Sequence, residues 1–279
     1  MIVKLRGGVG NQLFQYSFGR SLAVVRNEPV YFDKTDYLNT SFDGWFRLND
    51  WPTLTEYKAD GVKHGCTDPN FFWEPTLRFI PEVFTMSSET IFHGYWQTEK
   101  YFKGIQDEIR GTFSTPTGAM PEDIKQIKHE IQSTLHPAFI SVRRGDYLTP
   151  NLAKDFGCLH AEYYLTAKAH LLDRVPETKF FVFSDDPDWC KAKFPDCRII
   201  DHRGNGKAYP SAPWDLHLMS LCENAVIANS SFSWWGAWLI PNPNKIVIAP
   251  DDWFIVDWMK DEDIVPEEWV KHACTYCYS

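Results

Sequence analysis

The chain has 279 residues, 44% of them hydrophobic and 23% charged, which is enough for one large globular domain or two of ordinary size. Its 28 Lys and Arg against 37 Asp and Glu give a formal net charge of −9, which argues against general binding to nucleic acids or anionic membranes. No apolar run is long enough to span a bilayer, no secretory leader pattern opens the chain, and the seven cysteines are scattered. We therefore expect a cytoplasmic protein with reduced thiols.

The first predicted elements are a strand over residues 2–5, a glycine-rich turn over 7–11, a helix over 12–26 and a second strand over 29–33. Such a β-α-β unit implies a right-handed crossover and a parallel sheet. Apolar residues recur at helical spacing and predict the buried stripe of this helix, which consists of Phe14, Phe18, Leu22 and Val25.

The glycine turn has more than one interpretation. Gly8 and Gly10 match the first two glycines of a dinucleotide-binding fingerprint, and Asp33 lies where the ribose-binding acid would be. Leu13 replaces the third glycine, so the fingerprint is incomplete. An NAD(P)-dependent oxidoreductase is therefore one alternative. The turn is equally compatible with close approach of the backbone to another ligand, or with a simple tight turn.

Residues 34–90 are irregular and rich in aromatics, which suit core packing or stacking on sugar rings. This composition leaves open a second alternative, a non-catalytic carbohydrate-binding protein. A strand is predicted over 91–96 and a linker over 111–121, where turn residues cluster. The predicted domains are therefore residues 1–120 and 121–279, with the last ~25 residues packing back on the first domain.

The second half alternates between helix and strand patterns, which predicts a doubly wound α/β domain. A first helix begins at about residue 121. The strands are predicted over residues 138–142, 179–183, 197–200, 225–228 and 245–249. Further helices are predicted over about 160–173, 187–193, 213–222 and 231–240.

Polar residues follow the first four of these strands. In chain order they are Arg143 and Arg144, Asp185 and Asp186, Asp201, and Ser230 and Ser231. Ligands of open parallel sheets bind outside the carboxyl ends of the strands, and an arginine pair beside a serine-rich helix start suits a phosphate. Taken singly, a surface ion pair between Arg143 and Asp146 or helix capping by one serine is the simpler explanation. Neither explains the full set.

Five motifs stand in order along the chain. They are Gly7-Gly8-Val9-Gly10-Asn11-Gln12-Leu13-Phe14-Gln15-Tyr16, Gly94-Tyr95-Trp96-Gln97, Val142-Arg143-Arg144-Gly145-Asp146-Tyr147, Phe183-Ser184-Asp185-Asp186 and Asn229-Ser230-Ser231-Phe232-Ser233-Trp234-Trp235-Gly236. Together they resemble the α-1,2-fucosyltransferases of bacterial type, glycosyltransferase family 11, over nearly the whole chain. The resemblance implies an α/β protein of the GT-B fold, in which two Rossmann-like doubly wound domains face each other across a cleft and the C-terminal domain holds most of GDP-fucose.

The resemblance also implies roles for single residues. Arg143 and Arg144 would face the β-phosphate of GDP-fucose. Ser230 and Ser231 would cradle the diphosphate, and Phe232 would pack near the nucleotide.

Further roles follow from the same resemblance. Asp215 would read the guanine edge, and Asp185 would orient an arginine. Asn11 would reach the fucose or its phosphate from the N-terminal, acceptor-side domain, together with the backbone at Gly8 and Gly10. One departure stands out, because Ser141 occupies a position that is histidine in many fucosyltransferases.

No metal ion or other cofactor is expected. Asp186 and Asp188 flank Pro187 like the Asp-x-Asp with which other glycosyltransferases hold a metal. Pro187 suits the first position of a helix, so these residues are expected to open one instead. Two arginines can neutralise a diphosphate without a divalent ion.

The implied activity is inverting transfer of L-fucose from GDP-fucose to the 2-hydroxyl of a terminal β-galactoside. The expected acceptor is a galactose-terminated oligosaccharide. Lactose, a lacto-N-biose unit and an O-antigen intermediate of bacterial surface glycan synthesis all stay open. A lipid-linked acceptor would bring the enzyme into peripheral contact with the inner membrane. Glu99 and His93 are two candidates for the general base.

Overall fold

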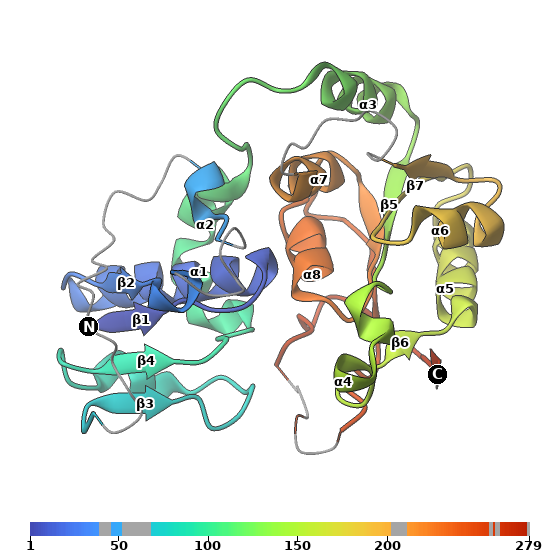
Figure 1. Ribbon diagram of the computed structural model, residues 1–279. Coiled ribbons are helices and arrows are strands. Elements are labelled where there is room, and N and C mark those ends of the chain that lie inside the picture. Colours follow the sequence, from blue (N-terminus) through green and yellow to red (C-terminus); the bar gives the residue numbers. More distant parts are fainter. Residues whose placement is uncertain (39–45, 52–67, 202–210, 257–258, 260–262, 278–279) are drawn as a thin grey trace. The chain divides into compact units, whose positions relative to one another are not determined.

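A computed structural model describes residues 1–38, 46–51, 68–201, 211–256, 259 and 263–277. The chain forms two compact units (Figure 1). Unit 1 comprises Met1–Thr117 and Asp261–Pro266, and unit 2 comprises Gly118–Lys260 and Glu267–Ser279. Within the described residues, no helix is both long and apolar enough to cross a membrane.

Unit 1 is built on a four-stranded parallel sheet with the strand order β2-β1-β4-β3. The strands are β1 (Ile2–Lys4), β2 (Tyr31–Asp33), β3 (Phe71–Trp73) and β4 (Ile91–His93). The helices are α1 (Val9–Arg26) and α2 (Gln106–Phe113), with short 3-10 turns η1 (Thr35–Tyr37), η2 (Leu48–Asp50), η3 (Pro81–Thr85), η4 (Glu99–Tyr101) and η5 (Lys103–Ile105). The predicted β-α-β unit is confirmed, although α1 begins inside the predicted glycine turn.

The buried stripe of α1 is shorter than predicted. Phe14, Phe18 and Leu22 are buried, whereas Val25 is 60% exposed, so its assignment to the core was wrong. The helix ends at Arg26, and Asn27 closes it in the left-handed conformation (φ 51°). Val25 therefore belongs to a last turn that is exposed to solvent.

Unit 2 contains a six-stranded parallel sheet with the order β11-β10-β9-β5-β7-β8. Its strands are β5 (Pro137–Val142), β7 (Lys179–Ser184), β8 (Arg198–Ile200), β9 (Asn224–Val226), β10 (Val247–Pro250) and β11 (Val270–His272). A separate antiparallel pair joins β6 (Cys158–Leu159) to β12 (Tyr276–Cys277). The five predicted strands of this half are confirmed, with ends displaced by one or two residues; β11 and the antiparallel pair were not predicted.

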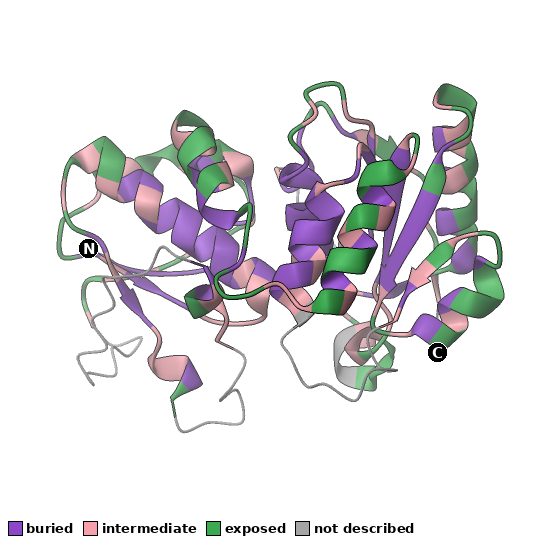
Figure 2. Cartoon of the chain, turned by 90° about the horizontal axis from the view of Figure 1, so that it is seen from above, coloured by how far each residue is buried: buried purple, intermediate pink, exposed green. Residues whose placement is uncertain are grey.

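Helices lie on both faces of this sheet, α5 and α6 on one side and α7 and α8 on the other (Figure 1). The helices of unit 2 are α3 (Glu122–Ser133), α4 (Pro150–Ala153), α5 (Ala161–Arg174), α6 (Pro187–Lys193), α7 (Ser211–Ser220) and α8 (Ser231–Trp238). All six residues of β5 are buried, and buried residues run along the strands in Figure 2. This arrangement confirms the doubly wound prediction for the second half.

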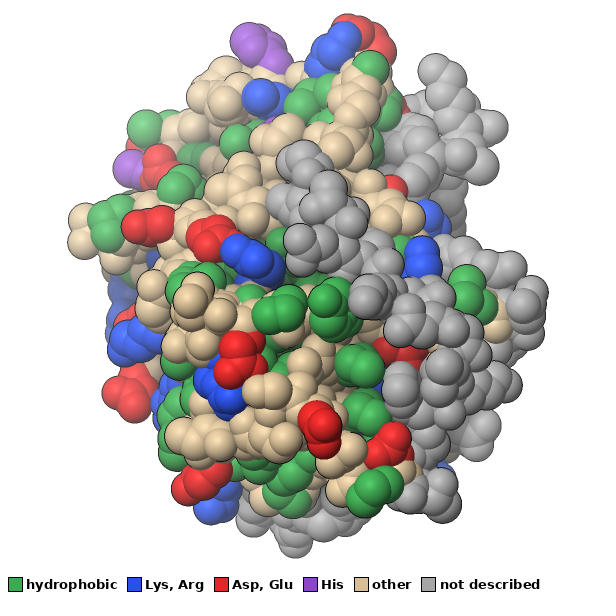
Figure 3. Space-filling view, turned by 90° about the vertical axis from the view of Figure 1, so that its left-hand side faces the viewer, with side chains coloured by type: hydrophobic (Ala, Val, Ile, Leu, Met, Phe, Trp, Pro, Cys, Tyr) green, Lys and Arg blue, Asp and Glu red, His purple; other side chains and the backbone are tan. Residues whose placement is uncertain are grey.

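The face shown in Figure 3 intersperses acidic, basic and apolar side chains. Part of the predicted aromatic-rich region cannot be compared with the prediction, because residues 39–45 and 52–67 lie outside the described residues. The predicted linker was too long. Its first residues form the end of α2, and α3 begins at Glu122.

Candidate active site

The strand order of unit 2 places a topological switch point between β5 and β9. From β5 the chain adds β7 and β8 on one side, then returns to add β9, β10 and β11 on the other. In open α/β sheets the crevice at such a point, outside the carboxyl ends of the strands, is where ligands bind. Arg143 and Arg144 directly follow β5, and Ser230 follows β9 by four residues. The predicted phosphate-binding residues therefore come from the two strands that flank the switch point.

Arg143 is held by two carboxylates but stays accessible. Its Nη2 lies 2.7 Å from Asp146 Oδ1 and its Nη1 lies 2.9 Å from Asp185 Oδ2, while 37% of the side chain is exposed. Its guanidinium carbon also lies 5.4 Å from the ring centre of Tyr147. Burial disfavours the charge, yet Asp185 and Asp146 outweigh it and raise the pKa of Arg143. The guanidinium is thus a fixed cation with part of its donor edge open to a ligand.

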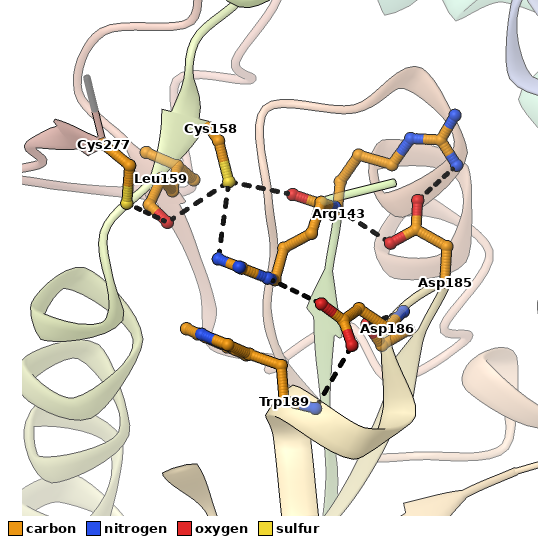
Figure 4. A network of polar contacts seen from close by, with 9 residues as sticks. Arg143, Cys158, Leu159, Asp185, Asp186, Trp189 and Cys277 are labelled. Carbon is orange, nitrogen blue, oxygen red and sulfur yellow. Dashed lines mark hydrogen bonds and ion pairs between the residues drawn. The ribbon is translucent and has the colours of Figure 1, made fainter. Parts of the chain in front are cut away.

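Arg144 is packed into the unit instead, against Cys158, Asp186 and Trp189, which are labelled in Figure 4. Its Nε donates to Asp186 Oδ2 at 3.1 Å, its Nη1 lies 3.7 Å from Cys158 Sγ, and its guanidinium carbon lies 4.2 Å from the ring centre of Trp189. Only 13% of its side chain is exposed. The two adjacent arginines therefore differ, since Arg143 faces the surface and Arg144 is stacked and bonded within unit 2.

Asp185 joins both arginines, as expected of a residue that orients them. One carboxylate oxygen accepts the backbone N–H of Arg144 at 2.9 Å, and the other pairs with Arg143. Gly145 makes this contact possible, because a Cβ at that position would lie 2.8 Å from Asp185 Oδ2. The Arg-Arg-Gly sequence and the Ser-Asp-Asp sequence are thus one packed cluster.

Asp186 opens a helix, as predicted. It is the N-cap of α6, accepts the backbone N–H of Trp189 at 3.2 Å, and is followed by Pro187 in the first turn. Its second oxygen binds Arg144. The Asp186 carboxylate is therefore engaged in a cap and an ion pair.

Ser230 and Ser231 form the start of α8. Ser230 is the N-cap residue and is buried, but its hydroxyl makes no capping hydrogen bond. Helix capping thus does not account for the Ser230 side chain. Ser231 and Phe232 are half-buried in the first turn, where helix N–H groups and the helix dipole favour an anion.

Asn229 ties the two strand ends together. Its backbone carbonyl accepts the hydroxyl of Tyr147 at 3.2 Å, across the switch point. Its Nδ2 donates to the carbonyls of Phe156 at 2.7 Å and Trp253 at 3.1 Å. Asn229 therefore fixes the loop in front of Ser230, a role that the motif alone did not indicate.

Ser141, the departure from the family pattern, is part of the core. Its hydroxyl lies 2.7 Å from the hydroxyl of Ser233, and both residues are buried. The pair links β5 to α8 beneath the switch point. Asp215 lies half-buried on α7 between buried Trp214 and Leu216, and its proposed contact with guanine stays a prediction.

The glycine turn of unit 1 is a tight turn closed by its own neighbours. Gly7 has a φ of 77°, and a Cβ there would lie 2.5 Å from Asn11 Nδ2. The carbonyl of Gly7 accepts the Gln12 amide at 3.0 Å and the Tyr37 hydroxyl at 2.7 Å. Gly8 is the N-cap of α1, and buried Gly10 lies in its first turn.

Asp33 does not resemble a ribose-binding acid in the structure. One of its oxygens pairs with Lys4 Nζ at 3.1 Å, and the other accepts the backbone N–H of Thr35 at 2.8 Å. Both Asp33 and Lys4 are buried. This geometry removes the residue that, with Gly8 and Gly10, supported the dinucleotide interpretation.

Asn11 is linked to the second motif. Its Oδ1 accepts the Gln97 amide at 2.7 Å. Gln15 makes a parallel link, since it accepts the backbone N–H of Arg6 at 3.0 Å and donates to the carbonyl of Gly94 at 2.9 Å. The structure thus brings the Gly7–Tyr16 and Gly94–Gln97 motifs together in unit 1, whereas the residues predicted to bind the nucleotide from the second half lie in unit 2.

Glu74 is a residue that the sequence did not single out. It follows β3 and accepts the backbone N–H groups of Tyr95 at 2.6 Å and Trp96 at 3.1 Å. Trp96 has a φ of 57°, and a Cβ on Gly94 would lie 2.5 Å from Glu74 Cβ. Burial raises the pKa of Glu74 to about 7, although the two N–H groups oppose this. No local pattern identifies such a residue, because its partners are 21 and 22 residues away along the chain.

His93 and Glu99 were the candidate bases. The Nε2 of His93 lies 3.1 Å from Arg6 Nη1, and burial with nearby Arg6 and Lys4 lowers the pKa of His93 to about 4. Since guanidinium groups only donate, the acceptor nitrogen of this neutral imidazole is already engaged. Glu99 lies half-buried in η4. The geometry disfavours His93 as a base and leaves Glu99 as a prediction.

Comparison with known proteins decides the family. Residues 78–273 match the model of glycosyl transferase family 11. The chain belongs to glycosyltransferase family 11. Its two α/β units with parallel sheets confirm the predicted GT-B class, and the cleft between them stays a prediction.

Named relatives of this glycosyltransferase are similar over almost its full length. It is 34% identical to an α-1,2-colitosyltransferase of Escherichia coli, with 97% of this chain and 98% of the relative covered. It is 38% identical to the O-antigen biosynthesis glycosyltransferase WbnK of Escherichia coli, covering 90% and 93%. It is 24% identical to the galactoside 2-α-L-fucosyltransferase Sec1 of Mus musculus, covering 92% and 72%. A glycosyltransferase is therefore established, and the oxidoreductase and non-catalytic alternatives are set aside.

Proposed function

We propose that this family 11 glycosyltransferase transfers L-fucose from GDP-fucose to the 2-hydroxyl of a terminal β-galactoside, with inversion and without a metal ion. The observation that carries the proposal is the half-exposed, carboxylate-held Arg143 at the switch point of unit 2, beside the start of α8. The fucosyltransferase named among the relatives supports the sugar and the linkage. Unit 2 is the proposed donor side and unit 1 the acceptor side.

In the proposed reaction the acceptor oxygen forms a bond to C1 of fucose as the bond from C1 to the β-phosphate oxygen breaks. The leaving GDP gains negative charge, and the acceptor hydroxyl loses its proton to a base. Arg143 and the first turn of α8 would stabilise the leaving charge. Arg144 would act through packing, because its guanidinium is stacked and bonded. Asp185 would hold Arg143 toward the phosphate.

Replacement of Arg143 tests the proposal. We expect Arg143→Ala to lower the turnover rate by ~10²–10³ and to remove the thermal stabilisation that GDP gives the wild-type protein. Ordinary activity in this variant would overturn the role of Arg143. Product linkage, determined on a small panel of β-galactosides, tests the 2-hydroxyl assignment.

Chelation tests the metal-free step. Treatment with EDTA is expected to leave fucosyl transfer unchanged, because the guanidinium of Arg143 and helix N–H groups would neutralise the diphosphate. Loss of activity that Mn²⁺ restores would contradict this part of the proposal. The natural setting we propose is O-antigen synthesis on a lipid-linked acceptor.

One relative supports a second donor. Colitose is fucose without the 3-hydroxyl, and an α-1,2-colitosyltransferase is similar over 97% of this chain. Competition between GDP-fucose and GDP-colitose for one galactoside acceptor shows which of the two donors the enzyme prefers. A kcat/KM that is at least tenfold higher for GDP-colitose would replace fucose by colitose in the proposal.

A further inference from the structure

We propose that Trp73 is a stacking platform for the galactose ring of the acceptor, an inference that rests on the proposed transfer to a galactoside. Trp73 is the last residue of β3, at the carboxyl edge of the unit 1 sheet, where ligands of parallel α/β sheets bind. Its side chain is 51% exposed. Among the described residues, every other large exposed hydrophobic side chain is aliphatic. An exposed indole at this edge is therefore a distinct feature of the surface.

The indole is braced from within the unit. Trp73 is the register partner of His93 on the neighbouring strand β4, and their ring centres are 3.9 Å apart. The ring of Phe71 lies 5.2 Å away from Trp73. His93 is itself only 6% exposed and is held by Arg6 at 3.1 Å. A platform fixed in this way loses little conformational freedom when a ligand stacks on it.

The chemistry of the edge suits a hexopyranose. One face of β-galactose presents the hydrogens on C3, C4 and C5, and such polarised C–H groups pack on the electron-rich face of an aromatic ring. Because Arg6 occupies Nε2 of His93, the neutral imidazole carries its proton on Nδ1. That buried Nδ1 has no hydrogen-bond partner in the described part of the chain. Because that Nδ1 is buried, the contact with the sugar would be made by the exposed face of the indole.

Steady-state kinetics with lactose as acceptor tests the platform. We expect Trp73→Ala to raise the acceptor KM about three- to tenfold and Trp73→Phe to raise it less, as loss of an aromatic contact implies. The KM for GDP-fucose and the thermal shift produced by GDP should not change. Val25→Ala is the matched control, because Val25 is an exposed apolar residue at the far end of α1. An acceptor KM in Trp73→Ala equal to that of Val25→Ala would overturn the platform.

Binding without turnover separates this inference from the proposed function. Saturation-transfer NMR with methyl β-galactoside should give a signal with the wild-type protein and a much weaker one with Trp73→Ala. If the wild-type protein transferred no sugar but showed this difference, the platform would stand and the proposed reaction would fail. If Trp73→Ala kept the full signal, the platform would fail whatever the activity. Circular dichroism melting of each variant controls for misfolding.

Discussion

Replacing Asp185 by Ala and by Asn distinguishes its hydrogen bond to the backbone of Arg144 from its ion pair with Arg143. Asp185→Ala removes an acceptor of the Arg144 backbone N–H, which lies 2.9 Å away, and an ion pair with Arg143 at the same distance. A hydrogen bond to a charged group contributes about 1.5–3 kcal/mol, whereas a pair as exposed as this one contributes about 0.5 kcal/mol. We therefore expect the free energy of unfolding to fall by about 2–3.5 kcal/mol. Asp185→Asn keeps an oxygen for the N–H and should lower it by less than about 1 kcal/mol.

Urea unfolding followed by circular dichroism measures these differences. Asp146→Asn is the matched control, since Asp146 pairs with the same guanidinium at 2.7 Å but with 37% of its side chain exposed. We expect it to lower the free energy of unfolding by about 0.5 kcal/mol. If Asp185→Asn were as destabilising as Asp185→Ala, the charge rather than the backbone hydrogen bond would hold the cluster. Equal effects of Asp146→Asn and Asp185→Ala would refute the reasoning altogether.

Three further predictions concern stability. Ser141→Ala should destabilise the protein by about 1 kcal/mol, because the hydrogen bond with Ser233 is lost. Ser141→His should destabilise it by about 1–3 kcal/mol, because the larger ring overpacks the buried site. A double-mutant cycle on Ser141 and Ser233 measures the first of these values. Gly94→Ala should destabilise the protein by about 1–3 kcal/mol, because the added Cβ would collide with Glu74. Gly104→Ala is the control and should not destabilise the protein, because there is open space around the added Cβ. Thermal melting of the two variants compares their stabilities. The pKa of Glu74 is raised to about 7 in the folded protein, against about 4.3 in an unfolded chain, so the folded state keeps the proton to higher pH. The free energy of unfolding should therefore fall as the pH rises from about 4.5 to 7, by at most ~1.4 kcal/mol per pH unit. Urea unfolding of Glu74→Gln at several pH values should lack this slope.

Periodic patterns identified the regular elements, but not those fixed by tertiary contacts. Five strands of the unit 2 sheet, β5, β7, β8, β9 and β10, lie in apolar runs between helical patterns, so the sequence predicted them. In contrast, β3 lies within an aromatic stretch that has no strand pattern, and β11 has the sequence Val-Lys-His with a single apolar residue. Gly111 suggested a linker although it lies within α2. Val25 continued the apolar spacing of α1 past the point where the sheet covers it.

The candidate site could be located from the sequence but not resolved in detail. Strand ends and motifs indicated the arginine pair, Asp185 and the start of α8. They did not show that Arg144 stacks on Trp189 while Arg143 stays accessible, because that difference depends on side chains from β6 and α6. Glu74 was missed for the same reason. Its partners become neighbours only once β3 pairs with β4.

The net charge around Arg143 and Arg144 determines how these residues can recognise a diphosphate. Arg143 and Arg144 are matched by three carboxylates, those of Asp146, Asp185 and Asp186, in a chain of net charge −9. The long-range field therefore does not attract an anion, and affinity must come from directional N–H donors at close range. A lysine keeps the charge but not the planar fork. Arg143→Lys should thus weaken GDP binding, measured by calorimetry, nearly as much as Arg143→Ala, with a shallow dependence on salt in the wild-type protein. Recovery of most of the affinity by lysine would mean that charge alone attracts the nucleotide.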